Sequence, residues 1–170
     1  MEPSTTKLNL QLTSAQTHAD DTINLFNDMQ WKHETIMGNY AFKRNQGLIS
    51  VTHYKAALKI AKHLFSQYED QLPPPDSLVP ILVISYLNLA DFWAQQGKNN
   101  QQKNCLIHAF DYLICKLNNL KSADHLHNHI CSGIDKIYPE LMLCLQDCQR
   151  LDILEEKKAM LASLQRGRII

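Results

Sequence analysis

The stretch YLNLADFWAQQGKNNQQKNCLIHAFDYL, residues 86–113, predicts two helices joined at one glycine. On both sides of Gly97, apolar residues recur every three or four positions, which is the spacing of a helix with one buried face. Glycine commonly takes the left-handed position that closes a helix, so Gly97 is expected to end the first one. Asn99 or Asn100 is then expected to open the second. The stretch therefore predicts an antiparallel helical hairpin.

A similar hairpin is predicted before this stretch. We expect one helix from Asp20 to near Gly47, and a second that starts from Ser50 as its N-cap. The second should stop before the prolines at 73–75, because proline and the residue before it disfavour helix. The positions expected on the buried face of the first helix are Ile23, Phe26, Ile36, Met37, Tyr40 and Ala41.

After the stretch, the pattern predicts further helices. The helix that begins beyond Gly97 should run to about Asn118, and Ser122 is expected to cap the next one. That helix should be interrupted or kinked near Gly133 and Pro139. Asp152 begins the sequence DILE, which reads as a capping box for a last helix. Alternating strand patterns are absent, so the predicted fold class is all-α with three consecutive hairpins.

The first two hairpins align without gaps at a constant offset of 52 residues, and one offset serves both helices. Small residues then fall where two helices cross, which lets their backbones approach closely, and bulky residues fill the grooves beside them. The aligned pairs are Gly38 with Ala90, Tyr54 with Leu106, and Ala57 with Ala109. The chain is therefore expected to contain an internal repeat.

These residues resemble the tetratricopeptide repeat (TPR) family, whose signature is W-x2-L-G-x2-Y in one helix and A-x3-F in the next. The matching residues are Tyr86, Leu89, Ala90 and Trp93, then Leu106 and Ala109. The resemblance implies a right-handed TPR-like array over residues 20–170, with about three antiparallel hairpins and a C-terminal capping helix. Residues 1–19 are expected to form a flexible tail. An array of this size also looks like the secretion chaperones of bacteria.

The resemblance also implies a binding groove. In the TPR family, the first helices of the hairpins line a concave groove that holds an extended peptide. The polar residues at such positions are Lys32, Thr35, Asn39, Lys43, Asn88, Asp91, Gln95 and Lys136. Members that clamp a terminal carboxylate use two asparagines and basic residues. Asn39, Asn88 and Lys136 match that pattern, whereas Thr35 and Glu140 stand where positive charge is expected. The implied function is non-catalytic binding of a protein or peptide, as an adaptor or chaperone.

Two alternatives stay open at this point. His125 and His129 share a helix face, as do Cys144 and Cys148, so the four side chains are a candidate metal or redox site. Nothing in the sequence shows that the two pairs face each other. The second alternative is a mainly structural homodimer, because a net charge of zero does little to oppose self-association.

Composition excludes other classes of function. Lysine plus arginine equals aspartate plus glutamate, at 17 each, so no broad basic surface favours nucleic acid. The apolar run from Leu78 to Ala90 is shorter than the roughly 20 residues of a membrane span. The five cysteines lack CxxC spacing and no secretory signal precedes them, so we expect reduced thiols in the cytoplasm. No catalytic motif is present, and neither an enzyme nor a cofactor is predicted.

Overall fold

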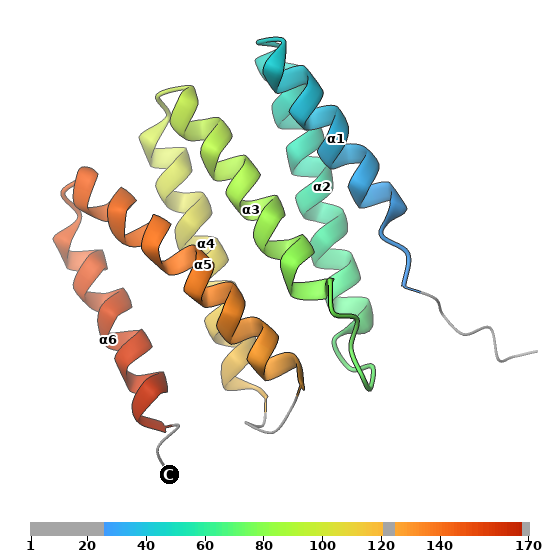
Figure 1. Cartoon of the computed structure of the whole chain (residues 1–170). Helices are drawn as coiled ribbons and strands as arrows, with labels where there is room; N and C mark the ends of the chain where they lie inside the picture. The colour runs from blue at the N-terminus through green and yellow to red at the C-terminus, as the bar shows by residue number, and fades with distance from the viewer. Residues whose placement is uncertain (1–25, 121–124, 168–170) are drawn as a thin grey trace, which may run out of the picture.

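The computed structural model describes residues 26–120 and 125–167, and within these ranges it contains six helices and no strand (Figure 1). The all-α prediction is therefore confirmed. The helices are α1 (Met29–Lys43), α2 (Gly47–Tyr68), α3 (Leu78–Gln95), α4 (Asn99–Asn118), α5 (His125–Asp147) and α6 (Leu151–Gly167). The tail predicted at residues 1–19 and the first residues of the helix predicted from Asp20, including Ile23, lie outside the described ranges, as does Ser122.

The helices stack in two layers. α1, α3 and α5 form the layer nearer the viewer in Figure 1, and α2 and α4 lie behind them. Within the front layer, α3 packs against α1 on one side and α5 on the other. Between the layers, α2 packs against α1 and α3, and α4 packs against α3 and α5. α3 is therefore the central helix of the fold, in contact with four others.

Ten residues of α3 are buried, which accounts for its apolar composition. By length and composition, α3 is the one helix in the described ranges that is long and apolar enough to cross a membrane, with a mean hydropathy of 1.3. The core helix of a folded domain passes the same test. Over half of its apolar window is buried inside the fold, against the neighbouring helices.

The aligned positions of the two hairpins are buried, as the repeat predicts. A methyl group added to Gly38 would lie 2.7 Å from the Tyr54 ring, so α1 and α2 approach too closely there for a larger residue. Ala57 and Ala109 are buried at the corresponding positions of α2 and α4. The rings of Phe42, Tyr54 and Phe92 lie within 6.4 Å of one another and join the two hairpins. The aromatic residues of 86–113 also belong to the core, with Phe92 and Phe110 buried and Trp93 and Tyr112 half-buried against them.

The buried face predicted for the first helix was partly wrong. Ile36, Met37 and Tyr40 are exposed, whereas Trp31 is buried and its Nε1 donates a hydrogen bond to Ser85 Oγ in α3 at 2.7 Å. The reason is the close contact with α2, which places Gly38 at the centre of the buried face. Ile36 and Tyr40 are each two residues from it, and therefore roughly 200° around the helix.

The predicted helix boundary near Gly47 was also wrong. α1 ends at Lys43, and Gly47 is the first residue of α2. Asn45 takes the left-handed conformation instead, with φ of 58°, because asparagine tolerates that region better than most residues. Ser50 lies inside α2, where its hydroxyl donates to the Gly38 carbonyl at 3.1 Å rather than capping the helix. Gly97 does adopt the expected conformation, with φ of 64°.

In the C-terminal half, the interruption predicted near Gly133 and Pro139 is absent, because α5 runs through both residues as one helix. Pro139 has no N–H to donate to the backbone carbonyl of Asp135. Both residues lie on the exposed side of α5, where water can donate a hydrogen bond to that carbonyl. Asp152 lies within the first turn of α6 and pairs with Arg150 at 2.6 Å, so it does not form the predicted capping box.

Candidate functional site

Each helix of the front layer carries four solvent-accessible residues at matching positions of the repeat. In α1, α3 and α5 these residues have the spacing i, i+4, i+7 and i+11, which follows one face of a helix. The three sets are related by the same 52-residue offset, and every member is exposed or half-buried. We call them the layer face. Its members are Lys32, Ile36, Asn39 and Lys43 of α1, Ile84, Asn88, Asp91 and Gln95 of α3, and Lys136, Glu140, Leu143 and Asp147 of α5.

Seven of the eight residues predicted to line a groove belong to the layer face. The eighth, Thr35, is half-buried beside it, and its Oγ1 is buried without a hydrogen-bond partner among the described residues. Two of the seven already have partners. Lys32 pairs with Asp28 at 2.8 Å, and the Asn39 side-chain carbonyl accepts a hydrogen bond from the Tyr54 hydroxyl at 2.8 Å. Asn39 therefore also supports the packing of α1 on α2.

The charges on the layer face are unevenly distributed. Lys43 extends from the end of α1, next to Arg44, whose guanidinium lies over the Tyr40 ring. On the opposite side, partial burial of the Asp91 carboxyl, and then its proximity to Glu140 of α5, raise the pKa of Asp91. The layer face is therefore basic at α1 and acidic where α3 meets α5.

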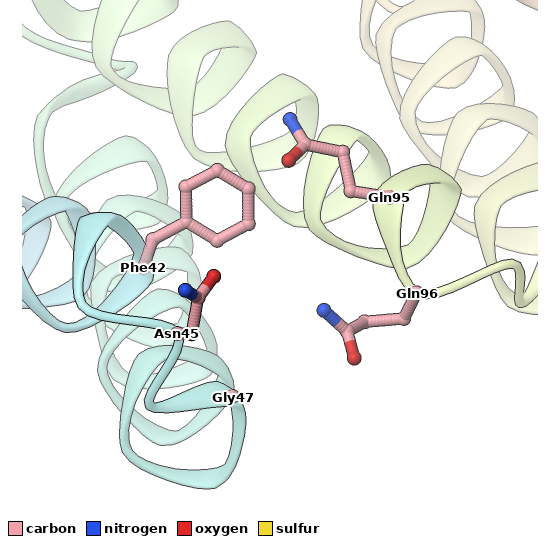
Figure 2. Close-up of a pocket in the computed structure, with 5 residues that line it drawn as sticks. All are labelled: Phe42, Asn45, Gly47, Gln95 and Gln96. Carbon is pink, nitrogen blue, oxygen red and sulfur yellow. The ribbon is translucent and has the colours of Figure 1, made fainter.

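A polar hollow of about 330 Å³ opens at one end of the layer, between the α1–α2 turn and the end of α3. Figure 2 shows the Phe42 ring and the Asn45 amide on one side of this hollow, and the Gln95 and Gln96 amides on the other; Gly47 also lines it. Carboxamides both donate and accept hydrogen bonds, and a phenyl ring offers an apolar surface. The hollow can therefore hold a peptide group with an adjoining apolar side chain.

Sequence reasoning missed the apolar members of the layer face. Ile36 is 63% exposed, Ile84 41% and Leu143 57%, and each comes from a different helix of the layer. Ile36 had been predicted to be buried, and neither of the others was considered for binding. The 52-residue offset could have identified these apolar residues. Ile36, Ile84 and Leu143 each lie 52 positions from a polar residue predicted to line the groove in α1 or α3.

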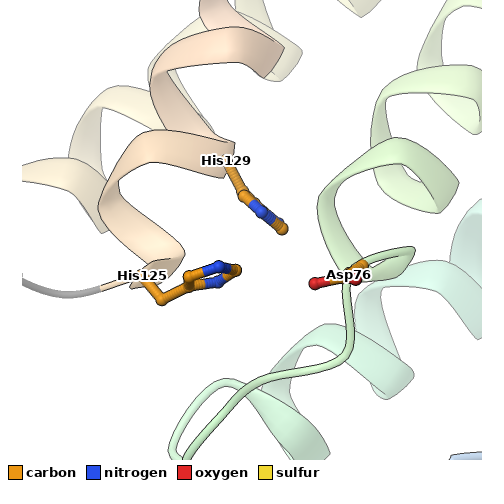
Figure 3. Close-up of side chains that lie close together, drawn as sticks. All are labelled: Asp76, His125 and His129. Carbon is orange, nitrogen blue, oxygen red and sulfur yellow. The ribbon is translucent and has the colours of Figure 1, made fainter.

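The two histidine and cysteine pairs of the predicted metal site lie apart. Cys144 follows His129 by fifteen positions in one continuous helix, which corresponds to roughly 22 Å along its axis. The structure therefore does not bring the four side chains together. His125 and His129 instead lie beside Asp76, which precedes α3 (Figure 3).

Two of the cysteines are expected to be chemically inert in the folded protein. Burial raises the pKa of the Cys105 thiol to about 12, and burial together with Cys148 raises that of Cys144 to about 11. Because the thiolate is the reactive form, iodoacetamide at pH 8 should label the exposed Cys115 first and leave Cys105 and Cys144 unmodified until the chain unfolds. Peptide mass spectrometry during a labelling time course measures this order. Rapid labelling of Cys105 or Cys144 in the folded chain would contradict it.

Residues 29–161 match the profile of DUF2753, which is described as a protein of unknown function. The chain belongs to the DUF2753 family. The match begins at the first residue of α1 and ends within α6, so the family's shared region includes the layer face, the polar hollow and the two histidines. Searches of curated proteins and of solved structures found no significant match to the chain.

Proposed function

We propose that the chain is a non-catalytic protein-interaction module with TPR-like architecture, which binds an extended segment of a partner protein across the layer face. It acts in the cytoplasm as an adaptor or chaperone. The observation that carries the proposal is the layer face itself, to which α1, α3 and α5 each contribute one exposed apolar side chain among amides and charges. Exposed apolar groups that gather on one side of a domain, rather than lying singly, are typical of docking surfaces.

The helix contacts support the TPR-like part of the proposal. α1, α3 and α5 contact one another in sequence, and α2 and α4 each pack against the first helix of the following pair. In a TPR array, each first helix likewise packs against its own second helix and the next first helix. The small residues at the repeat positions, Gly38 and Ala90, are buried as that packing requires.

The chemistry of the layer face indicates what kind of segment fits. Ile36, Ile84 and Leu143 favour apolar side chains, and the amides of Asn88 and Gln95 favour an extended backbone that needs hydrogen bonds. Charge complementarity then places an acidic residue of the partner near the basic end at α1, and a basic residue near the acidic side of α3 and α5.

A pair of matched substitutions tests the proposal. Ile36→Glu combined with Ile84→Glu places two charges on the layer face, at side chains that are 63% and 41% exposed. The control, Ile49→Glu, alters an isoleucine of α2 that is 48% exposed. Each exposed substitution is expected to change stability by about 0.5 kcal/mol or less. Proteins captured from lysate of the source cells are compared by quantitative mass spectrometry for the wild type, the double variant and the control.

The proposal predicts a partner that the wild type and the control retain, and that the double variant loses by about tenfold or more. Equal capture by all three forms contradicts it. Light scattering on the purified wild type, double variant and control tests the homodimer alternative. If the wild type is a dimer and only the double variant is a monomer, the layer face holds a second copy of this chain instead of a partner protein.

A further inference from the structure

Three metal-ligating side chains meet at the end of the fold opposite the polar hollow. His125 and His129 occupy the first turns of α5, and Asp76 lies in the connection that leads into α3. One ligand atom from each lies within 4.8 Å of the others, and the two imidazole rings are 4.6 Å apart between centroids. Figure 3 shows both rings directed toward the Asp76 carboxylate across the gap between the two elements.

The spacing of these atoms suits a transition metal. A tetrahedral zinc ion holds its ligands about 2 Å away, and therefore roughly 3.3 Å from one another. Asp76 and His125 are exposed and His129 is half-buried, so their side chains are free to rotate by the small amounts that close this difference. The i, i+4 spacing of the histidines keeps both rings on one side of α5.

The local charge also favours a cation. His125 borders a second hollow, of about 150 Å³, whose lining residues include Glu69 and Asp70. Glu69 is paired with Lys116 at 2.7 Å, whereas Asp70 is exposed to solvent. The positive end of the α5 dipole disfavours a bound cation. The nearby carboxylates of Asp76 and Asp70 are negatively charged and offset this effect.

We propose that His125, His129 and Asp76 form a binding site for a divalent transition metal of the zinc class. Two imidazole nitrogens with one carboxylate oxygen form a ligand set that zinc accepts, and water completes the fourth position at this exposed site. Magnesium and calcium prefer ligand sets made entirely of oxygen and are excluded. The bound ion links the α2–α3 connection to the start of α5 and so joins the second hairpin to the third. This inference does not depend on the proposed docking function.

The test uses full-length protein without an affinity tag, stripped with chelator and dialysed. Isothermal titration with Zn²⁺ at pH 7.5 is expected to show one site per chain, and thermal melting is expected to show a higher Tm with Zn²⁺ present. His125→Ala and Asp76→Asn should each weaken Zn²⁺ binding by about tenfold or more. His63→Ala, which removes an exposed histidine of α2, is the matched control and should bind like the wild type.

Three outcomes overturn the proposal. The first is the absence of stoichiometric Zn²⁺ binding by the stripped wild-type protein. The second is an affinity in His125→Ala equal to that of His63→Ala, which would locate binding elsewhere. The third is comparable binding of Mg²⁺, which would exclude the imidazole ligands. Melting of each metal-free variant shows that it is folded, so lost binding is separated from lost structure.

Discussion

Replacing Trp31 by alanine is expected to lower the free energy of unfolding by about 3–5 kcal/mol. Trp31 is only 8% exposed, and it occupies the space between α1 and the central helix α3. Its Nε1 donates to Ser85 Oγ, which in turn donates to the Ile81 carbonyl at 2.8 Å. The substitution therefore leaves a cavity between the first two hairpins and removes a buried hydrogen bond. Urea unfolding followed by circular dichroism measures the loss.

Two further variants separate packing from hydrogen bonding at this position. Trp31→Phe retains a large ring but has no donor for Ser85, so it should cost about 1–3 kcal/mol, less than alanine. Trp93→Ala removes a half-buried tryptophan from α3 and should also cost less than Trp31→Ala. If Trp31→Ala unfolds at the same urea concentration as the wild type, the first hairpin does not pack on the second through this residue.

Replacing Gly133 by valine is expected to cost about 3 kcal/mol. A methyl group at Gly133 would lie 2.8 Å from Val79 Cγ1, 3.1 Å from Val83 Cγ2 and 3.4 Å from Leu113 Cδ1. α5 therefore approaches α3 and α4 too closely for a side chain at this position. Glycine inside a helix costs roughly 1 kcal/mol relative to alanine, and close packing is the physical reason to retain one here. Thermal and urea unfolding measure the effect.

A neighbouring position supplies the control for Gly133. Ser132→Val introduces the same β-branched side chain on the exposed side of α5 and should change stability by about 0.5 kcal/mol. Truncating Val79 to alanine should partly rescue Gly133→Ala, because the shorter side chain makes room for the added methyl group. Equal stability of Gly133→Val and Ser132→Val would show that α5 does not pack against α3 as described.

The hairpin at residues 86–113 was predictable because each of its signals is local. Apolar spacing sets the buried faces, and Gly97 has no side chain to oppose the left-handed turn. The 52-residue offset then extended the prediction to Gly38 and Tyr54. Both positions lie where two successive helices pack closely. Such packing requires a small residue at the crossing and a bulky residue beside it, and both kinds of residue are visible in the sequence.

The orientation of α1 was not predictable in the same way. Ile36 and Tyr40 are apolar enough to suggest a buried stripe. In the described part of the chain, however, α1 packs only against α2 and α3, so one side of α1 is exposed to solvent. Its true buried face is set by Gly38 and by the bond from Trp31 to Ser85, a residue 54 positions away. Such long-range pairing leaves no periodic signal.

The two candidate sites also differ in how far they could be predicted from the sequence. Most of the polar residues of the layer face were predicted, because the resemblance to the TPR family implies a groove lined by the first helices of the hairpins. The grouping of Asp76 with His125 and His129 was missed because it depends on how the proline-rich connection is placed beside α5. A carboxylate some fifty positions before its partners cannot be assigned to them from spacing.

The measurement that tests the docking proposal most directly is site-specific photo-crosslinking in the source cells. A photoreactive phenylalanine analogue is placed at Ile36, Ile84 or Leu143 of the layer face, and at Ile49 of α2 as the control. We expect all three positions on the layer face to crosslink to the same protein, and Ile49 not to crosslink to it. Crosslinking from Ile49 with none from the layer face would contradict it.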